Sequence, residues 1–188
     1  MSEATTRQRL IEVAIELFGE HSVAGTSLQM ISEALGLTKS AIYHYFRTRD
    51  ELLDAILDPV LAELAVLIAE AEAQRTARAR ADRMLIGYAA LAAANRNLIS
   101  VLSSDPHVTE LVRRRAEWSS TVTRQMRLFA ALEPGVGGQV NAAIVMSGFA
   151  GAARGEFEAL DDDALRDQLV AAGRRTLGLR APRAVSGR

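Results

Sequence analysis

Helix-forming residues dominate this chain along its whole length, and no other feature limits its possible folds as strongly. Aromatic residues make up 5% of the sequence, and the alternation of β-branched and polar residues that marks strands is rare. Alanine, leucine, arginine and glutamate dominate instead. Apolar residues recur at the spacing of amphipathic helices, which predicts an all-α fold of about nine helices. The 188 residues are enough for one large or two small domains with a real core.

Charge and cysteine content narrow the possible functions. The chain has 22 basic and 23 acidic residues and a formal charge of −1, so it is not a generally basic protein that coats nucleic acid. It has no cysteine, which excludes disulfides, cysteine-ligated zinc and a cysteine nucleophile and suits a reducing cytosol. We find no signal peptide and no apolar run near the ~18 residues of a membrane span. We therefore expect a cytoplasmic protein without a membrane partner.

The N-terminal part of the chain has the pattern of short helices separated by tight turns. The apolar stripe of the first predicted helix consists of Leu10, Val13, Ala14, Leu17 and Phe18. Gly19 and Ser22 mark its end. Thr26 and Gln29 then match a capping box, in which each side chain satisfies a backbone amide at the start of a second helix.

A four-residue turn joins the second predicted helix to a third. The buried side of the second helix is expected to contain Leu28, Ile31, Ala34 and Leu35. Gly36 ends this helix, because glycine adopts the left-handed conformation cheaply. Thr38 caps a very short third helix, in which Ile42 faces the core. This layout is that of a helix-turn-helix domain, whose last helix reads DNA.

Within the first 50 residues, whose net charge is −1, an excess of positive charge occurs only at the predicted reading helix and its flanks. Residues 34–49 contain Lys39, Arg47 and Arg49 and no acidic residue. A DNA-docking face needs charge of one sign, whereas a solvated helix surface usually mixes signs. Lys39 is the only lysine in the chain, and at the start of the reading helix it can reach a phosphate or a guanine edge.

Residues 26–56, TSLQMISEALGLTKSAIYHYFRTRDELLDAI, resemble the DNA-binding segment of the TetR family of bacterial regulators. About a dozen positions match the family pattern in register, which is a specific signal. The matching residues are Thr26, Ser27, Ile31, Gly36, Leu37, Thr38, Ile42, Tyr43, Tyr45, Phe46 and Leu53. Beyond residue 60 the resemblance is one of architecture.

Several positions depart from the family pattern. Ser40 and Ala41 replace the common small pair at the front of the reading helix, which we expect to alter base preference. Arg49 stands where lysine is usual, and either residue can grip a phosphate. Ser22 stands where glycine is common, at a small expected cost to the turn.

The resemblance implies three groups of DNA contacts. Phosphate at a helix N-terminus would be bound by Thr26 and Ser27. Base edges in the major groove would be contacted by Thr38, Lys39, Ser40 and Ala41. The DNA backbone would be held by Tyr43, His44 and Arg49. The DNA would be a double-stranded inverted repeat, because a two-fold dimer presents its reading helices ~34 Å apart.

The rest of the chain is predicted to form a second helical domain. The predicted domains are a DNA-binding domain at 4–64, an effector-binding and dimerisation domain at 65–180 and a disordered tail at 181–188. An apolar stripe from Leu53 to Ile68 contains Pro59, so we expect a kink or break near Asp58. Residues 81–102 are apolar on several faces, which predicts one central buried helix.

A small apolar or amphipathic effector is expected to bind in this second domain, without any cofactor or metal. Aromatic, methionine and polar groups between helices suit a ligand cavity, although any core contains them too. The candidate lining residues are Tyr88, Asn95, His107, Trp118, Met126 and Phe149. Asn95 lies on a buried stripe, where its amide bonds either a neighbouring helix or a ligand.

The C-terminal helices carry a signal for self-association. Small residues that allow close helix approach recur at Ala143, Ser147, Gly151 and Gly155. One face of the last predicted helix, 161–178, consists of Leu165, Leu169, Ala172 and Thr176. The TetR resemblance implies that these two helices pair with their copies in a four-helix homodimer interface.

Two other classes of function are weaker. An enzyme is disfavoured because the sequence has no phosphate-binding glycine loop, no H-E-x-x-H motif and no nucleophile elbow. A helical protein-interaction adaptor with no specific DNA site is the main alternative, but it does not explain the acid-free basic segment. The sequence thus predicts a ligand-responsive repressor that binds a palindromic operator as a dimer.

Overall fold

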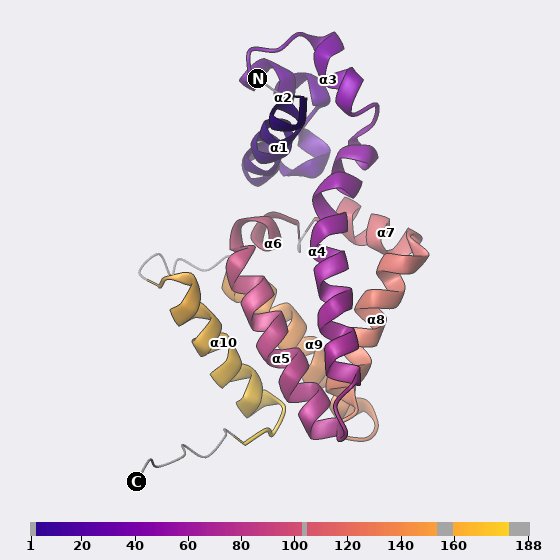
Figure 1. The fold of residues 1–188 in the computed structure, drawn as a ribbon, viewed down its shortest axis with the longest axis vertical. Coiled ribbons are helices and arrows are strands. Elements are labelled where there is room, and N and C mark those ends of the chain that lie inside the picture. Colours follow the sequence, from indigo (N-terminus) through magenta and orange to yellow (C-terminus); the bar gives the residue numbers. More distant parts are fainter. Residues whose placement is uncertain (1–2, 103–104, 154–159, 181–188) are drawn as a thin grey trace. The chain divides into compact units, whose positions relative to one another are not determined.

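The computed structural model describes residues 3–102, 105–153 and 160–180. These ranges form ten helices and no strand, which confirms the predicted all-α fold (Figure 1). The helices are α1 (Glu3–Gly25), α2 (Leu28–Ala34), α3 (Lys39–Tyr45), α4 (Arg49–Glu72), α5 (Ala77–Ala94), α6 (Arg96–Leu102), α7 (Pro106–Arg114), α8 (Ala116–Ala130), α9 (Val136–Ala153) and α10 (Asp162–Thr176). Within the same ranges, no helix has the length and apolar character that a bilayer span requires. The predicted tail at 181–188 lies outside the described residues.

The single helix predicted over 81–102 is two helices, α5 and α6. Asn95 leaves the helical conformation with φ −113° and ψ 29°. Its backbone amide and its side-chain amide both donate to the carbonyl of Leu91, at 3.1 and 3.0 Å. The Asn95 side chain therefore bonds the last turn of its own helix, and the break adds one helix to the number expected.

Helix α4 runs through Pro59, so of the kink or break predicted near Asp58 the break does not occur. Pro59 and Asp58 are exposed. Proline has no backbone N–H, so the carbonyl four residues before it lacks its usual donor. Water can bond this carbonyl on the exposed side of the helix, which limits the loss of helix stability.

The chain divides into two compact units, and their composition differs from the predicted domains. Unit 1 comprises Met1–Glu63 with Arg96–Ser119, and unit 2 comprises Leu64–Asn95 with Ser120–Arg188. Sequence reasoning assigns all of 65–180 to the second domain, whereas the structure groups 96–119 with the DNA-binding part. The physical reason is a shared core, in which Val108, Leu111 and Trp118 are buried with the apolar residues of α1 to α4.

Helix α1 continues past Gly19 and is interrupted at Ser22. Ser22 has φ 64° and ψ 166°, a region that residues other than glycine rarely adopt. Its hydroxyl accepts a hydrogen bond from the amide of Gly25 at 3.2 Å. The strain expected for a serine at this glycine-preferring position is therefore present.

Unit 2 is held together by close packing of α5, α9 and α10, and α5 and α10 lie side by side in Figure 1. A Cβ atom added to Gly173 of α10 would come within 2.4 Å of the Leu85 side chain, so a larger residue at this crossing would force buried Leu85 to move. Beside it, Arg174 donates to both carboxylate oxygens of Asp82, at 2.8 and 3.1 Å. The two helices are thus joined by a close approach and a bidentate ion pair.

Candidate nucleic-acid interface

The turn between α2 and α3 is a glycine-dependent helix ending. Gly36 has φ +66°. The amide of Gly36 donates to Glu33 and that of Leu37 donates to Ser32, at 2.9 and 2.8 Å, as in a Schellman motif. Ala34, expected on the buried side of α2, is exposed, because only Leu28, Ile31 and Ser32 of this short helix are buried.

The N-cap of α2 is Ser27 and not Thr26, so the predicted capping box is displaced by one residue. The Ser27 hydroxyl accepts a hydrogen bond from the amide of Met30 at 3.1 Å. Thr26 is 1% exposed, and its hydroxyl donates to the carbonyls of Leu17 and Ser22. Thr26 is therefore buried between α1 and α2. At this depth its side chain cannot make the predicted phosphate contact. Ser27 stays exposed.

Helix α3 has one buried side and one exposed side. Thr38 caps the helix by accepting from the amide of Ala41 at 3.3 Å, and Ile42 is fully buried. Ala41 is half-buried. The predicted contact residues on the exposed side are Lys39, Ser40, Tyr43 and His44. Tyr43 exposes 42% of its surface, which is unusual for a large aromatic residue.

The residues after α3 add two arginines to the same segment, Arg47 in the loop and Arg49 at the start of α4. Thr48 accepts a hydrogen bond from the amide of Glu51 at 3.1 Å, and Glu51 accepts one from the amide of Arg47 at 2.7 Å. These two hydrogen bonds cap the start of α4 and engage the carboxylate of Glu51 with a backbone amide. Arg47 is exposed and Arg49 half-buried. The contact set predicted from the sequence does not include Arg47, although the local positive charge indicates it.

The acid that follows Arg49 is also held within unit 1. Asp50 accepts a hydrogen bond from Nε2 of His107 at 2.9 Å, and Arg114 lies 3.6 Å from its other oxygen. No side chain of the described residues pairs with Lys39, Arg47 or Arg49. We call Lys39, Ser40, Tyr43, His44, Arg47 and Arg49 the basic face.

The six predicted effector residues fall into both units. In unit 1, His107 bonds Asp50, and the indole N–H of buried Trp118 donates to Asp58 at 3.1 Å. In unit 2, Tyr88 stacks on Phe149 at 5.3 Å between ring centroids. Met126 is 36% exposed and Asn95 ends α5. Of the six, the structure brings together Tyr88 and Phe149.

Sequence reasoning missed a buried amide beside this aromatic pair. Gln125 is 1% exposed, and its Nε2 has no hydrogen-bond partner among the described residues. The Tyr88 hydroxyl donates to the carbonyl of Met146 at 3.3 Å. Burial raises the pKa of Tyr88 to about 12, and the nearby amide of Gln125 opposes this increase in part. Polar groups therefore lie within the apolar interior of unit 2.

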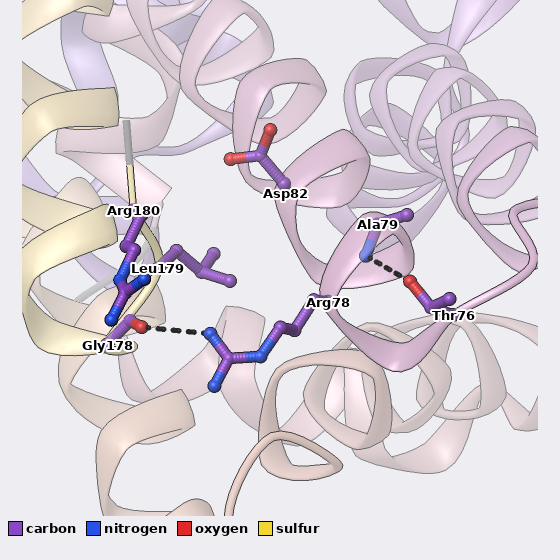
Figure 2. A pocket seen from close by; sticks show the side chains of 7 residues that line it. All are labelled: Thr76, Arg78, Ala79, Asp82, Gly178, Leu179 and Arg180. Atoms are coloured by element: carbon purple, nitrogen blue, oxygen red, sulfur yellow. Dashed lines mark hydrogen bonds between the residues drawn. The ribbon is translucent and has the colours of Figure 1, made fainter. Parts of the chain in front are cut away.

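A separate cavity lies where the start of α5 meets the residues after α10 (Figure 2). It has a volume of about 740 Å³. Its lining consists of Thr76, Arg78, Ala79, Asp82, Gly178, Leu179 and Arg180, with Arg78 directed at the carbonyl of Gly178. The lining contains none of the six predicted effector residues.

The predicted dimer residues differ strongly in exposure. Ala143 and Ser147 are exposed, Gly151 is half-buried and Gly155 lies outside the described residues. Leu165 and Leu169 are 3% and 5% exposed, so they pack inside the protomer and their assignment to the interface is wrong. Ala172 and Thr176 are half-buried, and the Thr176 hydroxyl donates to the carbonyl of Ala172.

Known proteins resemble this chain in two ways. Residues 10–56 match the family described as bacterial regulatory proteins, tetR family. The transcriptional regulator AcrR of Shigella flexneri is 41% identical over 51 residues, which cover 27% of this chain and 24% of AcrR. The acrEF/envCD operon repressor of Escherichia coli K12, named as probable, is 41% identical over 61 residues, which cover 31% and 28%. These matches span about a quarter of the curated relatives.

Solved structures extend the similarity to the rest of the fold. A TetR-family regulator from Streptomyces coelicolor A3 has a TM-score of 0.71 and 22% identity, with 92% of this chain and 91% of that chain covered. At this identity the likeness concerns the fold. It shows that the helices of the C-terminal part are arranged as in a TetR-family protein.

Proposed function

We propose that this chain, whose helix-turn-helix segment belongs to the TetR family, is a dimeric transcriptional repressor that binds an inverted-repeat operator. The basic face carries this proposal. It combines a capped, exposed α3 with Lys39, Arg47 and Arg49, whose charges are not neutralised by the described side chains. Repression is supported by the repressor name of one relative of this segment.

The reading mechanism follows from the two sides of α3. Ile42 anchors the helix in the core of unit 1, so that its exposed side can enter the major groove. Lys39 and Ser40 would contact base edges, with the Ala41 methyl near a thymine. Tyr43, His44 and Arg49 would hold phosphates, and Arg47 and Ser27 are added to this group because they are exposed.

The dimer would form through an exposed face of α9. Val136, Val140 and Ile144 are 73%, 49% and 52% exposed. With Ala143, Ser147 and Gly148 they form what we call the apolar face. These residues recur at three- and four-residue intervals, so they lie on one side of the helix. A second copy of the chain would remove this apolar area from water, and α10 would contribute through its exposed side rather than through Leu165 and Leu169.

An effector would bind in the interior of unit 2, beside Tyr88, Phe149 and Gln125. The unpaired Nε2 of Gln125 would be satisfied by a ligand carbonyl or hydroxyl, and the stacked rings would contact an apolar body. A ligand with different affinities for the DNA-binding and free states would then derepress the gene.

The test is binding of the purified protein to its own upstream DNA and to a scrambled duplex at several salt concentrations. We expect preference for the upstream DNA, a steep loss with salt and loss on Lys39→Ala. Arg75→Ala is the matched control, because Arg75 is an exposed arginine in unit 2. Equal binding of both duplexes by the wild-type protein, followed by failure to enrich any genomic fragment, would favour the adaptor function.

A further inference from the structure

We propose that Asp105 is a positioning residue for the reading helix, because it holds the strained end of α1 in place. This inference rests on the proposed DNA-binding function for its consequence, although the contact itself is independent of DNA. Asp105 lies 82 residues after Val23 in the chain, yet the Val23 amide donates to its Oδ2 at 3.0 Å.

The carboxylate of Asp105 serves two segments of unit 1 at once. Its Oδ1 caps α7 by accepting from the amides of His107 and Val108, at 2.8 and 3.4 Å. Its Oδ2 accepts from Val23, and Asp105 is 7% exposed. A helix cap needs one accepting oxygen, so the second oxygen has a role beyond capping.

The Val23 contact acts at the most strained point of unit 1. Val23 follows Ser22, whose backbone conformation persists only where its surroundings enforce it. The carbonyl of Ser22 accepts from the Thr26 hydroxyl at 2.9 Å, and Thr26 precedes the N-cap of α2. A continuous set of contacts therefore leads from Asp105 through the interruption in α1 to α2 and α3.

Helix α7 also contacts the other flank of the reading segment. His107 and Arg114 both pair with Asp50, which follows Arg49 in the first turn of α4. One helix thus contacts the chain before α2, at Val23, and after α3, at Asp50. We infer that α7 braces both flanks and that Asp105 is its buried contact.

Asp105→Asn separates the two roles of this carboxylate. Asparagine keeps one accepting oxygen for the cap but places a donor where Oδ2 accepts from Val23. Asp161→Asn is the matched control, because Asp161 caps α10 through the amide of Ala164 at 2.7 Å. We expect Asp105→Asn to weaken operator binding at least ~10-fold at a temperature where circular dichroism shows it folded, and Asp161→Asn to change it less than ~2-fold. Equal operator affinity of Asp105→Asn and wild type would overturn the proposal.

Hydrogen exchange gives a readout that does not depend on DNA. We expect the Val23 amide and the amides of α2 to exchange at least ~10-fold faster in Asp105→Asn, and those of unit 2 to be unchanged. Unchanged exchange at Val23 overturns the inference even if DNA binding falls. If the wild-type protein binds no DNA specifically but exchange at Val23 rises, the proposed function fails and the contact role of Asp105 stands.

A double-mutant cycle tests the route through Ser22. Glycine adopts the conformation at position 22 without strain, so Ser22→Gly should reduce the need for the Asp105 contact. We expect the loss of operator affinity caused by Asp105→Asn to be at least ~3-fold smaller in the Ser22→Gly background. Independent, multiplicative effects would show that Asp105 does not act through the interruption in α1.

Discussion

The basic face of α3 and the apolar face of α9 are both exposed, yet they differ in the interactions that they can make. The basic face consists of polar and cationic side chains on the seven-residue helix α3 and on the residues that follow it, Arg47 and Arg49. The apolar face lies on an eighteen-residue helix and leaves valine and isoleucine side chains about half exposed or more. Cationic side chains bind the phosphate backbone of DNA in a salt-dependent way. Exposed apolar side chains instead favour contact with another protein surface. The two proposed partners, DNA and a second copy, follow from this difference.

The largest effect is expected from charges placed on the apolar face. Val140→Asp/Ile144→Asp should produce a monomer, because burial of two carboxylates at an interface is costly. Operator affinity should fall ~100-fold or more, since the two half-sites no longer add their binding energies. Analytical ultracentrifugation and a DNA titration measure both changes. Val66→Asp is the control at another exposed valine, and a double variant that stays dimeric would refute the assignment of this face.

The buried side of α9 packs against Tyr88 of α5, which stacks on Phe149 and offers a pH test. An unfolded tyrosine loses its proton near pH 10, whereas the raised pKa of about 12 keeps Tyr88 neutral in the folded chain. Above pH 10 the unfolded state therefore binds fewer protons, and the folded state should lose about 2 to 3 kcal/mol of stability between pH 10 and 12. Chemical denaturation at several pH values should show a smaller loss for Tyr88→Phe. Tyr43→Phe, at the exposed tyrosine of α3, is the matched control variant.

Substitutions on the basic face should separate base reading from phosphate binding. Lys39→Ala should cost about 1 to 3 kcal/mol on the correct operator and relax its specificity. Arg49→Ala should weaken binding to all sequences alike and reduce the salt slope by about 1. Fluorescence anisotropy with operator and scrambled duplexes distinguishes the two patterns. Equal losses on both duplexes for Lys39→Ala would place Lys39 on a phosphate instead.

The smallest effect concerns Gly148 on the apolar face. No atom lies within 4 Å of a Cβ added there, so Gly148→Ala should stabilise an isolated α9 by about 1 kcal/mol through helix propensity. In a dimer with closely packed α9 helices the added methyl group should instead weaken association. Thermal denaturation in the monomeric Val140→Asp/Ile144→Asp background and in the wild-type dimer should thus give opposite signs. Ser147→Ala, which adds no volume, should change association less.

Much of the basic face could be predicted because its determinants are local. Gly36 and Thr38 shape the turn through contacts within a few residues, and their sequence signals are strong. The N-cap of α2 is harder to predict, because Thr26 and Ser27 are adjacent hydroxyl residues. Only the hydrogen bond from Thr26 to the carbonyl of Leu17 shows which of the two is buried.

The rest depends on contacts between distant segments. The pairing of Val23 with Asp105 brings α7 into unit 1, and no local pattern indicates it. Leu165 and Leu169 illustrate the same limit in unit 2. Their spacing shows that they share a side of α10, but only the neighbouring helices decide whether that side faces the protomer core or a partner.

The shortness of α3 has a consequence for how much information one copy of the protein can extract from a genome. Seven residues extend about 10 Å, close to the ~12 Å width of the major groove, so one helix contacts only about four base pairs. A four-base-pair word recurs by chance about every 256 base pairs, whereas two such words at a set separation recur about every 65,000. Self-association through α9 would therefore determine how well the protein distinguishes its operator from other sites in the genome.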